Sequence, residues 1–268
     1  MEKYRLLFLG DIQSLQAIEF LEKNFEYLKN TYKPDIIIAN AENASTGKGC
    51  TEVEANHLFK LGIKVLTGGN HSFDKPKSQK LLETNEYVLR PNNFPVGTIG
   101  KGYAIVNLND NVKIGVISLQ GRALMDAIDC PFRNFENLLS NEFKNIKIIF
   151  VDFHAETTAE KYAFFKYFDG KVTAIVGTHT HIQTNDEQIS EKGTAYISDV
   201  GMVGPYDSVI GIKQEAAINR LLYQTPQYFV PAENDFQICG VVVDFNIDGK
   251  ALQIEKIFYP GLIKIREI

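Results

Sequence analysis

The chain has 268 residues, with 28 basic and 33 acidic side chains and a formal net charge of −5. Hydrophobic residues make up 44% and charged residues 23%, a balance typical of globular proteins that excludes disordered, collagen-like and coiled-coil chains. The negative charge excludes the global basic field that drives non-specific binding to nucleic acids or anionic membranes.

Short apolar runs alternate with helical patterns along the chain. A helix is predicted over residues 15–30, where apolar residues recur at the spacing of one helical face. A second helix is predicted over 52–61, closed by Gly62 as a C-cap. The runs predicted as strands span residues 5–9, 35–39, 63–67, 112–119, 147–153, 172–176 and 194–198.

This alternation predicts a layered α/β fold. Several predicted strands are continuously apolar, which indicates sheets covered on both faces. Near the C-terminus, residues 237–246 and 252–259 flank Asp248-Gly249, a hairpin signal, so antiparallel strands are expected there. Because no repeat or linker divides the sequence, we predict one domain over residues 1–268.

Composition also bears on location. The longest apolar runs are far shorter than the about 18 residues that a membrane span needs. The apolar stretch 6–9 is followed by Asp11, with no small-residue cleavage site. Cys50, Cys130 and Cys239 contain no close pair, which argues against a disulfide framework or a thiolate zinc cage. We therefore expect a cytoplasmic protein without a membrane partner.

Polar residues that can bind metals gather where predicted strands end. They are Asp11, Asn40, Glu42, Asn43, Asn70, His71, His154, His179 and His181. In an α/β sheet the crevice outside the carboxyl ends of the strands is where ligands bind, so residues more than a hundred positions apart can converge there. The sequence thus predicts one site built from five segments.

The late histidine pair is informative by its spacing. His179 and His181 are two residues apart, which in extended or turn geometry places both imidazoles on one side. Gly177, just before them, allows close backbone approach. The pair can offer one nitrogen to each of two neighbouring ions.

The remaining residues can complete a dinuclear site. Glu42 can bridge two ions, Asp11 and Asn43 can add oxygens to one, and Asn70 and His154 can complete the other. Mixed oxygen and nitrogen ligation without sulfur suits Fe, Mn or Zn, in pairs about 3.5–4 Å apart as in two-metal phosphoesterases.

Charge arithmetic favours a phosphate substrate. Two divalent ions carry +4 and Asp11 and Glu42 remove 2, which leaves about +2 to hold a bridging hydroxide and a phosphodiester anion. His71 is then the natural proton donor to the leaving alkoxide. In the alternative assignment, His71 is a ligand and Asn70 is a turn residue, and spacing alone does not choose between them.

Five motifs carry a family resemblance: Gly10-Asp11, Asn40-Ala41-Glu42-Asn43, Gly69-Asn70-His71, Asp152-Phe153-His154-Ala155-Glu156 and Gly177-Thr178-His179-Thr180-His181. They resemble the motifs of the calcineurin-like metallophosphoesterases, and more closely those of the YmdB-like bacterial branch. The resemblance extends through Arg90-Pro91-Asn92, Ser198-Asp199-Val200-Gly201-Met202 and Asp207-Ser208-Val209-Ile210-Gly211. The sequence departs from the branch at Gln13-Ser14, which bears on substrate access.

The resemblance implies a four-layer α/β/β/α sandwich of mixed sheets with a dinuclear centre, di-iron or similar. It implies phosphodiesterase activity on cyclic nucleotides, notably 2′,3′-cyclic ones and also 3′,5′-cyclic ones. By motif match, one ion is expected on Asp11, Glu42, Asn43 and His181, and the other on Glu42, Asn70, His154 and His179. His71 is expected to be the proton donor.

Several alternatives stay open at this stage. An amidohydrolase usually places its His-x-His pair early in the chain, whereas here it comes late. A regulatory or nucleotide-sensing protein that acts through partners would need no proton donor, and a phosphomonoesterase would use the same metals. Asp152, Glu156 and Asp199 are candidates for orienting ligand histidines, with cap, turn or surface roles as the alternative. RNA ends are a further candidate substrate, and a homo-oligomer is expected.

Overall fold

The computed structural model describes residues 2–260, in which thirteen strands form two mixed sheets and six helices flank them. The helices are α1 (Leu15–Tyr32), α2 (Glu52–Leu61), α3 (Pro76–Thr84), α4 (Pro131–Ser140), α5 (Thr158–Phe168) and α6 (Gln214–Tyr223). The first sheet has the order β2 (Asp11–Ile12), β11 (Met202–Pro205), β12 (Phe236–Asn246), β1 (Lys3–Leu9), β3 (Ile36–Asn40), β4 (Val65–Thr67), and β13 (Ala251–Tyr259) also pairs with β12. The second has the order β5 (Tyr103–Asn107), β6 (Lys113–Gln120), β7 (Ile148–His154), β8 (Ala174–Thr178), β10 (Ala195–Ile197), β9 (Gln188–Ile189).

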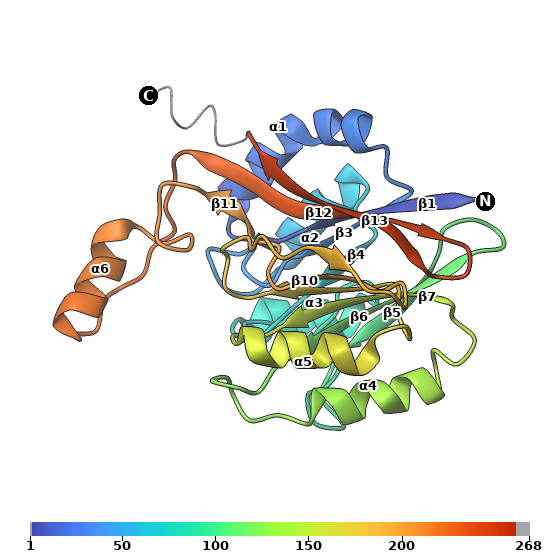
Figure 1. Cartoon of the computed structure of the whole chain (residues 1–268). Helices are drawn as coiled ribbons and strands as arrows, with labels where there is room; N and C mark the ends of the chain where they lie inside the picture. The colour runs from blue at the N-terminus through green and yellow to red at the C-terminus, as the bar shows by residue number, and fades with distance from the viewer. Residues whose placement is uncertain (1, 261–268) are drawn as a thin grey trace.

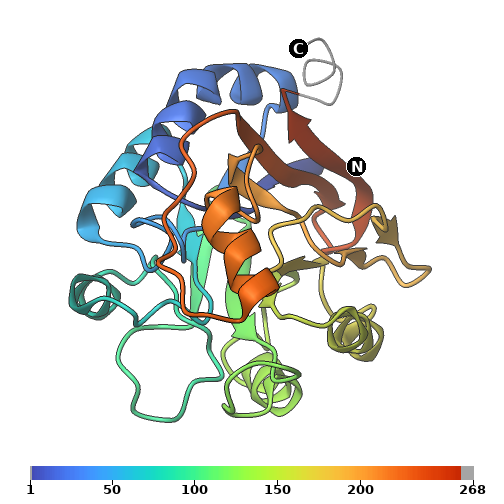
Figure 2. The same cartoon turned by 90° about the vertical axis from the view of Figure 1, so that its left-hand side faces the viewer.

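The two sheets face each other, and helices cover their outer sides (Figures 1 and 2). Apolar side chains of both sheets meet in the middle, where the rings of Phe8 and Phe150 lie 5.0 Å apart. On one outer face, Leu21 and Phe25 of α1 are buried against the first sheet. On the other, α5 buries Phe164 against the second sheet. The predicted four-layer sandwich is confirmed.

The local predictions hold with small shifts at the ends. All seven predicted strands and both predicted helices form, and Gly62 caps α2 with a φ of 100°. The C-terminal hairpin of β12 and β13 turns at Gly249, whose φ is 80°. Asn40 and His154, expected just beyond their strands, are instead the last residues of β3 and β7. The sequence had not delimited the other four helices.

Helix α6 departs from the layered arrangement and projects from the body of the molecule (Figure 1). Within residues 2–260, no helix combines the length and apolar character that crossing a membrane requires. The cytoplasmic location expected from the sequence stays a prediction. So does the single domain over 1–268, of which residues 1 and 261–268 lie outside the described part.

Candidate metal centre

Parallel pairing brings the predicted residues to one edge of the sandwich. β1, β3 and β4 run parallel in the first sheet, and β6, β7 and β8 run parallel in the second. Their carboxyl ends meet across the two sheets, where Nδ2 of Asn40 donates a hydrogen bond of 2.9 Å to Oδ2 of Asp152. The turns after these strands therefore face one another, as the sequence predicts.

His154 lies at the centre of the first group of side chains. Its Nε2 is 2.9 Å from Oδ1 of Asn70, 3.0 Å from Nδ1 of His179 and 3.1 Å from Oε1 of Glu42. Ligand atoms on one octahedral ion with bonds of about 2.1 Å are separated by about 3 Å, the same spacing. Glu42, His154 and His179 could together hold a metal ion.

Hydrogen bonds behind the ligands fix which ring nitrogen faces this group. Nδ1–H of His154 donates to Oγ1 of Thr178 at 2.9 Å, and that hydroxyl donates to Oδ1 of Asp152 at 2.7 Å. Nε2–H of His179 lies 3.1 Å from Oε2 of Glu156. In these tautomers, lone pairs of two imidazoles, one carboxylate and one amide oxygen point at the same space. Only a cation or a proton relieves their repulsion.

A second group of side chains adjoins the first through Glu42. Nδ2 of Asn43 lies 3.2 Å from Oε1 of Glu42 and 3.1 Å from Nε2 of His181, whose Nδ1–H donates to the carbonyl of Ile210 at 2.8 Å. If the Asn43 amide is rotated by 180°, its oxygen takes the place of its nitrogen beside Glu42 and His181, where it can act as a metal ligand.

Asp11 supplies the clearest sign that these residues suit a cation. Its carboxylate is fully buried, and Oδ1 has no hydrogen-bond partner anywhere in the described chain. Nε2 of His181 and Nδ1 of His154 each lie 3.8 Å from that oxygen. Because an unpaired buried charge is costly, a cation between Asp11 and its neighbours fits the residues present.

The backbone is shaped to hold these groups close. A Cβ at Gly69 would lie 2.2 Å from Oε2 of Glu42 and 2.3 Å from Cδ2 of His154, so only glycine fits there. His179 and His181 adopt φ values of 99° and 63°, in the left-handed region that non-glycine residues avoid. Such strain costs about 1–3 kcal/mol per residue and concentrates at functional sites. The pair thus lies in a strained turn rather than an extended segment.

Burial and mutual attraction shift the pKa values of the group in different directions. Burial raises the pKa of Asp11 to about 7. Burial acts against ionisation of Glu42, but attraction to His154 outweighs it and lowers the pKa of Glu42 to about 2. Burial acts to lower the pKa of His154, whereas Glu42 raises it to about 9. Burial, with repulsion from His154, lowers the pKa of His179 to about 3.

His71 lies beside the group without joining it. Its backbone N–H donates to Oε2 of Glu42 at 3.1 Å, while its Nδ1 lies 2.8 Å from Oδ2 of Asp74. The side chain keeps 27% of its surface exposed. The oxygen of Asn70, not the ring of His71, faces His154, so the geometry favours Asn70 over His71 as the ligand.

Some contributing residues were not found from the sequence. Thr178 belongs to one of the five motifs. Its hydrogen bonds to Asp152 and His154, however, depend on the pairing of β7 with β8, which the sequence does not show. Asp74 follows His71 by three residues, a spacing that could have suggested a partner. The amide of Gln13 lies 2.9 Å from Nδ1 of His181, so this departure from the family pattern touches a predicted ligand.

Comparisons with known proteins cover nearly the whole chain. The family model described as YmdB-like protein matches residues 7–257. The chain is 42% identical over 254 residues to the 2′,3′-cyclic-nucleotide 2′-phosphodiesterase of Bacillus subtilis (strain 168), which covers 94% of this chain and 96% of that protein. It is 38% identical over 264 residues to a putative phosphatase/phosphodiesterase of Mycoplasma genitalium, covering 96% and 92% respectively.

Solved structures show the same fold. A crystal structure of a novel phosphatase from Mycoplasma pneumoniae has a TM-score of 0.90 and 32% sequence identity, and covers 96% of this chain and 94% of that chain. A crystal structure of a hypothetical protein from Thermus thermophilus has a TM-score of 0.89 and 34% identity, and covers 95% of this chain and 98% of that chain.

Proposed function

The chain belongs to the YmdB-like family, and we propose that it is a metal-dependent phosphodiesterase that hydrolyses cyclic nucleotides, 2′,3′-cyclic ones above all. The name of the Bacillus subtilis relative supports the substrate class. The observation that carries the proposal is that Asn70, His179 and Glu42 each place a ligand atom about 3 Å from Nε2 of His154. The oxygen of Asp11 that is unpaired within the described chain lies beside this group.

In this proposal the same residues would hold two divalent ions. Asp11, Glu42, Asn43 and His181 would hold one, and Glu42, Asn70, His154 and His179 would hold the other. The donor set of nitrogen and oxygen without sulfur fits iron, with manganese and zinc as alternatives. Such ions, when bound, supply an ionised water as nucleophile and offset the charge that develops on the phosphoryl oxygens.

His71 delivers the proton that the leaving alkoxide needs. In the imidazolium form, its Nδ1–H donates to the carboxylate of Asp74, which orients the ring, and its Nε2–H is the proton available for donation. The hydrogen bond from its backbone to Glu42 fixes its distance from the centre. Because the ring of His71 is partly exposed, it can contact a substrate phosphate without displacing a metal ligand.

Other phosphate esters belong to the same proposal as secondary substrates. 3′,5′-cyclic nucleotides and RNA ends carry the same reacting group, and discrimination among them depends on the walls beside the centre. Homo-oligomeric assembly stays a prediction.

Hydrolysis of a 2′,3′-cyclic nucleotide by protein loaded with Fe(II) or Mn(II) tests the proposal. We expect turnover that metal-free protein lacks, loss of both activity and bound metal in His154→Ala, and loss of activity with metal retained in His71→Ala. General acid catalysis typically contributes about 10²–10⁴-fold, which sets the expected loss for His71→Ala.

His57→Ala is the matched control, since His57 lies on α2 outside the site. No turnover of cyclic nucleotides or a generic diester by fully loaded protein would reject the proposal in favour of a sensing role.

A further inference from the structure

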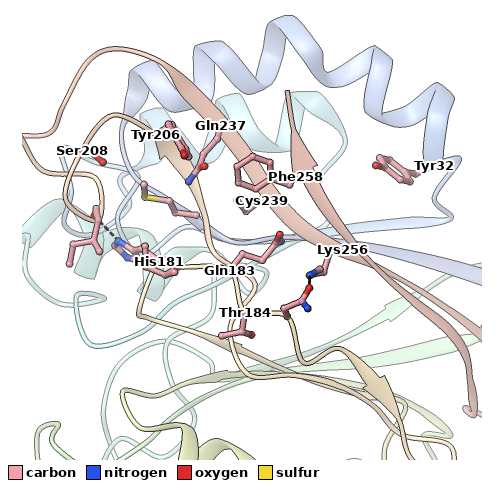
Figure 3. A pocket seen from close by; sticks show the side chains of 14 residues that line it. Tyr32, His181, Gln183, Thr184, Tyr206, Ser208, Gln237, Cys239, Lys256 and Phe258 are labelled. Carbon is pink, nitrogen blue, oxygen red and sulfur yellow. Dashed lines mark hydrogen bonds between the residues drawn. The ribbon is translucent and has the colours of Figure 1, made fainter. Parts of the chain in front are cut away.

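A pocket of about 660 Å³ opens directly beside the metal centre (Figure 3). His181 forms part of its wall, and the pocket continues from there along β12 and β13. Its size lies within the about 300–1,000 Å³ of small-molecule sites. A ligand group attached to a phosphate at the metal centre therefore has a cavity within reach.

Gln237 of β12 points its amide into this pocket (Figure 3). The side chain is only 6% exposed, and its Oε1 has no hydrogen-bond partner among residues 2–260. Buried amide oxygens are almost always hydrogen-bonded in native proteins, because an unpaired one costs free energy. An amide presents an acceptor and a donor side by side, so it can pair with a ligand edge that carries the complementary two groups.

Aromatic side chains in the same wall supply apolar surface for a planar group. The rings of Tyr206 and Phe258 lie 6.2 Å apart at 84°, edge to face, and Ile210 and Met202 also line the pocket. Aromatic faces bind planar heterocycles by stacking, with little dependence on their sequence or substituents.

Charge in the pocket favours a neutral ligand over an anion. Its one lysine, Lys256, donates to Oδ1 of Asn185 and lies 3.4 Å from Oε2 of Glu187. The cation is thus already paired, so the pocket offers no second phosphate site. A neutral aromatic group with adjacent donor and acceptor atoms fits better.

We propose that this pocket binds the nucleobase of the substrate, with the amide of Gln237 pairing to the base edge, the ring of Tyr206 stacking on its face and Phe258 adding an apolar contact. Each common base carries adjacent donor and acceptor atoms, so the proposal concerns nucleobases as a class. It rests on the proposed function, since the phosphate is taken to lie at the metal centre beside His181.

The test compares adenosine 2′,3′-cyclic phosphate with the 2′,3′-cyclic phosphate of methyl riboside, which lacks the base. In the metal-loaded wild type we expect kcat/KM to be at least about tenfold higher for the nucleotide. Gln237→Met and Tyr206→Ala should each reduce this ratio about tenfold, the value of one lost hydrogen bond or stacking contact. Gln253→Met, at an exposed position of β13, is the matched control and should keep the wild-type ratio.

Binding of adenosine 3′-monophosphate, measured by titration calorimetry, separates the two proposals. If cyclic phosphates are hydrolysed with no preference for the base, or if Gln237→Met keeps the ratio, the pocket proposal is wrong and the phosphodiesterase stands. If no cyclic phosphate is hydrolysed but Gln237→Met weakens nucleotide binding about tenfold and Gln253→Met does not, the pocket stands and the phosphodiesterase fails. If the variant binds as the wild type does, the pocket proposal is overturned in either case.

Discussion

A buried ion pair between Lys161 of α5 and Asp199 supports the turn that carries the two late histidines. Nζ of Lys161 lies 2.9 Å from Oδ2 of Asp199, and both side chains are only 1% exposed. The same carboxylate accepts hydrogen bonds from the backbone N–H of Thr180 at 3.0 Å and of Gly201 at 2.9 Å. Replacing Lys161 by methionine keeps most of the volume and leaves a buried carboxylate without its cation.

The cost follows from that burial. Removing one partner of a buried pair destabilises proteins by about 3–5 kcal/mol, because the other charge stays desolvated. The two backbone donors on Asp199 offset part of this, so we expect Lys161→Met to lower the free energy of unfolding by about 3 kcal/mol. Urea denaturation monitored by circular dichroism measures the change.

Lys166→Met is the matched control on the same helix. Lys166 is exposed and lies over the rings of Tyr162 and Phe165, at 4.8 and 4.6 Å from their centroids. Its replacement should cost no more than about 1 kcal/mol. If Lys161→Met destabilises the protein no more than Lys166→Met does, the pair contributes nothing specific and this reasoning is refuted. A double variant, Lys161→Met with Asp199→Asn, should recover part of the loss.

Two further predictions concern other carboxylates. Asp74→Asn should lower kcat by about 10- to 100-fold and leave the metal content unchanged. The reason is that it removes a charged hydrogen bond to His71 worth about 1.5–3 kcal/mol. A parallel loss of bound metal would contradict this. Burial acts to raise the pKa of Asp244, but Arg5 and Lys3 outweigh it and hold that pKa below the ordinary value of an aspartate. The carboxylate therefore stabilises the fold above the unfolded pKa and loses that effect as pH falls through the folded one. The stability deficit of Asp244→Asn should shrink as an acid titration passes below about pH 4, the ordinary pKa of an aspartate, and a constant deficit would disprove the linkage.

The sheets could be predicted because their strands are short apolar runs with clear ends. Residues 148–153 are apolar at almost every position, as expected of a short strand covered on both faces. Helices were harder, since a helix shows in the sequence only when one face is apolar and the other polar. In α6, Ala217 is the one buried residue among 214–223. The helix therefore has no apolar face packed on the protein, and its sequence shows no clear helical pattern.

The candidate site was predictable for a different reason, namely that parallel strands bring their carboxyl ends to one edge. That rule places Asp11, Glu42 and His154 together without any knowledge of distances. The choice between Asn70 and His71 was beyond it, because neighbouring residues in a turn point in different directions. In the structure, the side chain of Asn70 contacts His154, whereas the ring of His71 contacts Asp74, which favours Asn70 as the ligand.

Two acceptors without hydrogen-bond partners among the described residues, Oδ1 of Asp11 and Oε1 of Gln237, differ in what would satisfy them. A carboxylate beside imidazoles calls for a cation, whereas a neutral amide between aromatic rings calls for a hydrogen-bonding heterocycle. His181 borders both places, because its Nε2 lies 3.1 Å from Nδ2 of Asn43 and the residue also lines the pocket. A ligand that satisfies both acceptors must combine an anion that binds metal with a planar polar ring a short distance away. A nucleotide has that composition, and neither an inorganic phosphate nor a free base does.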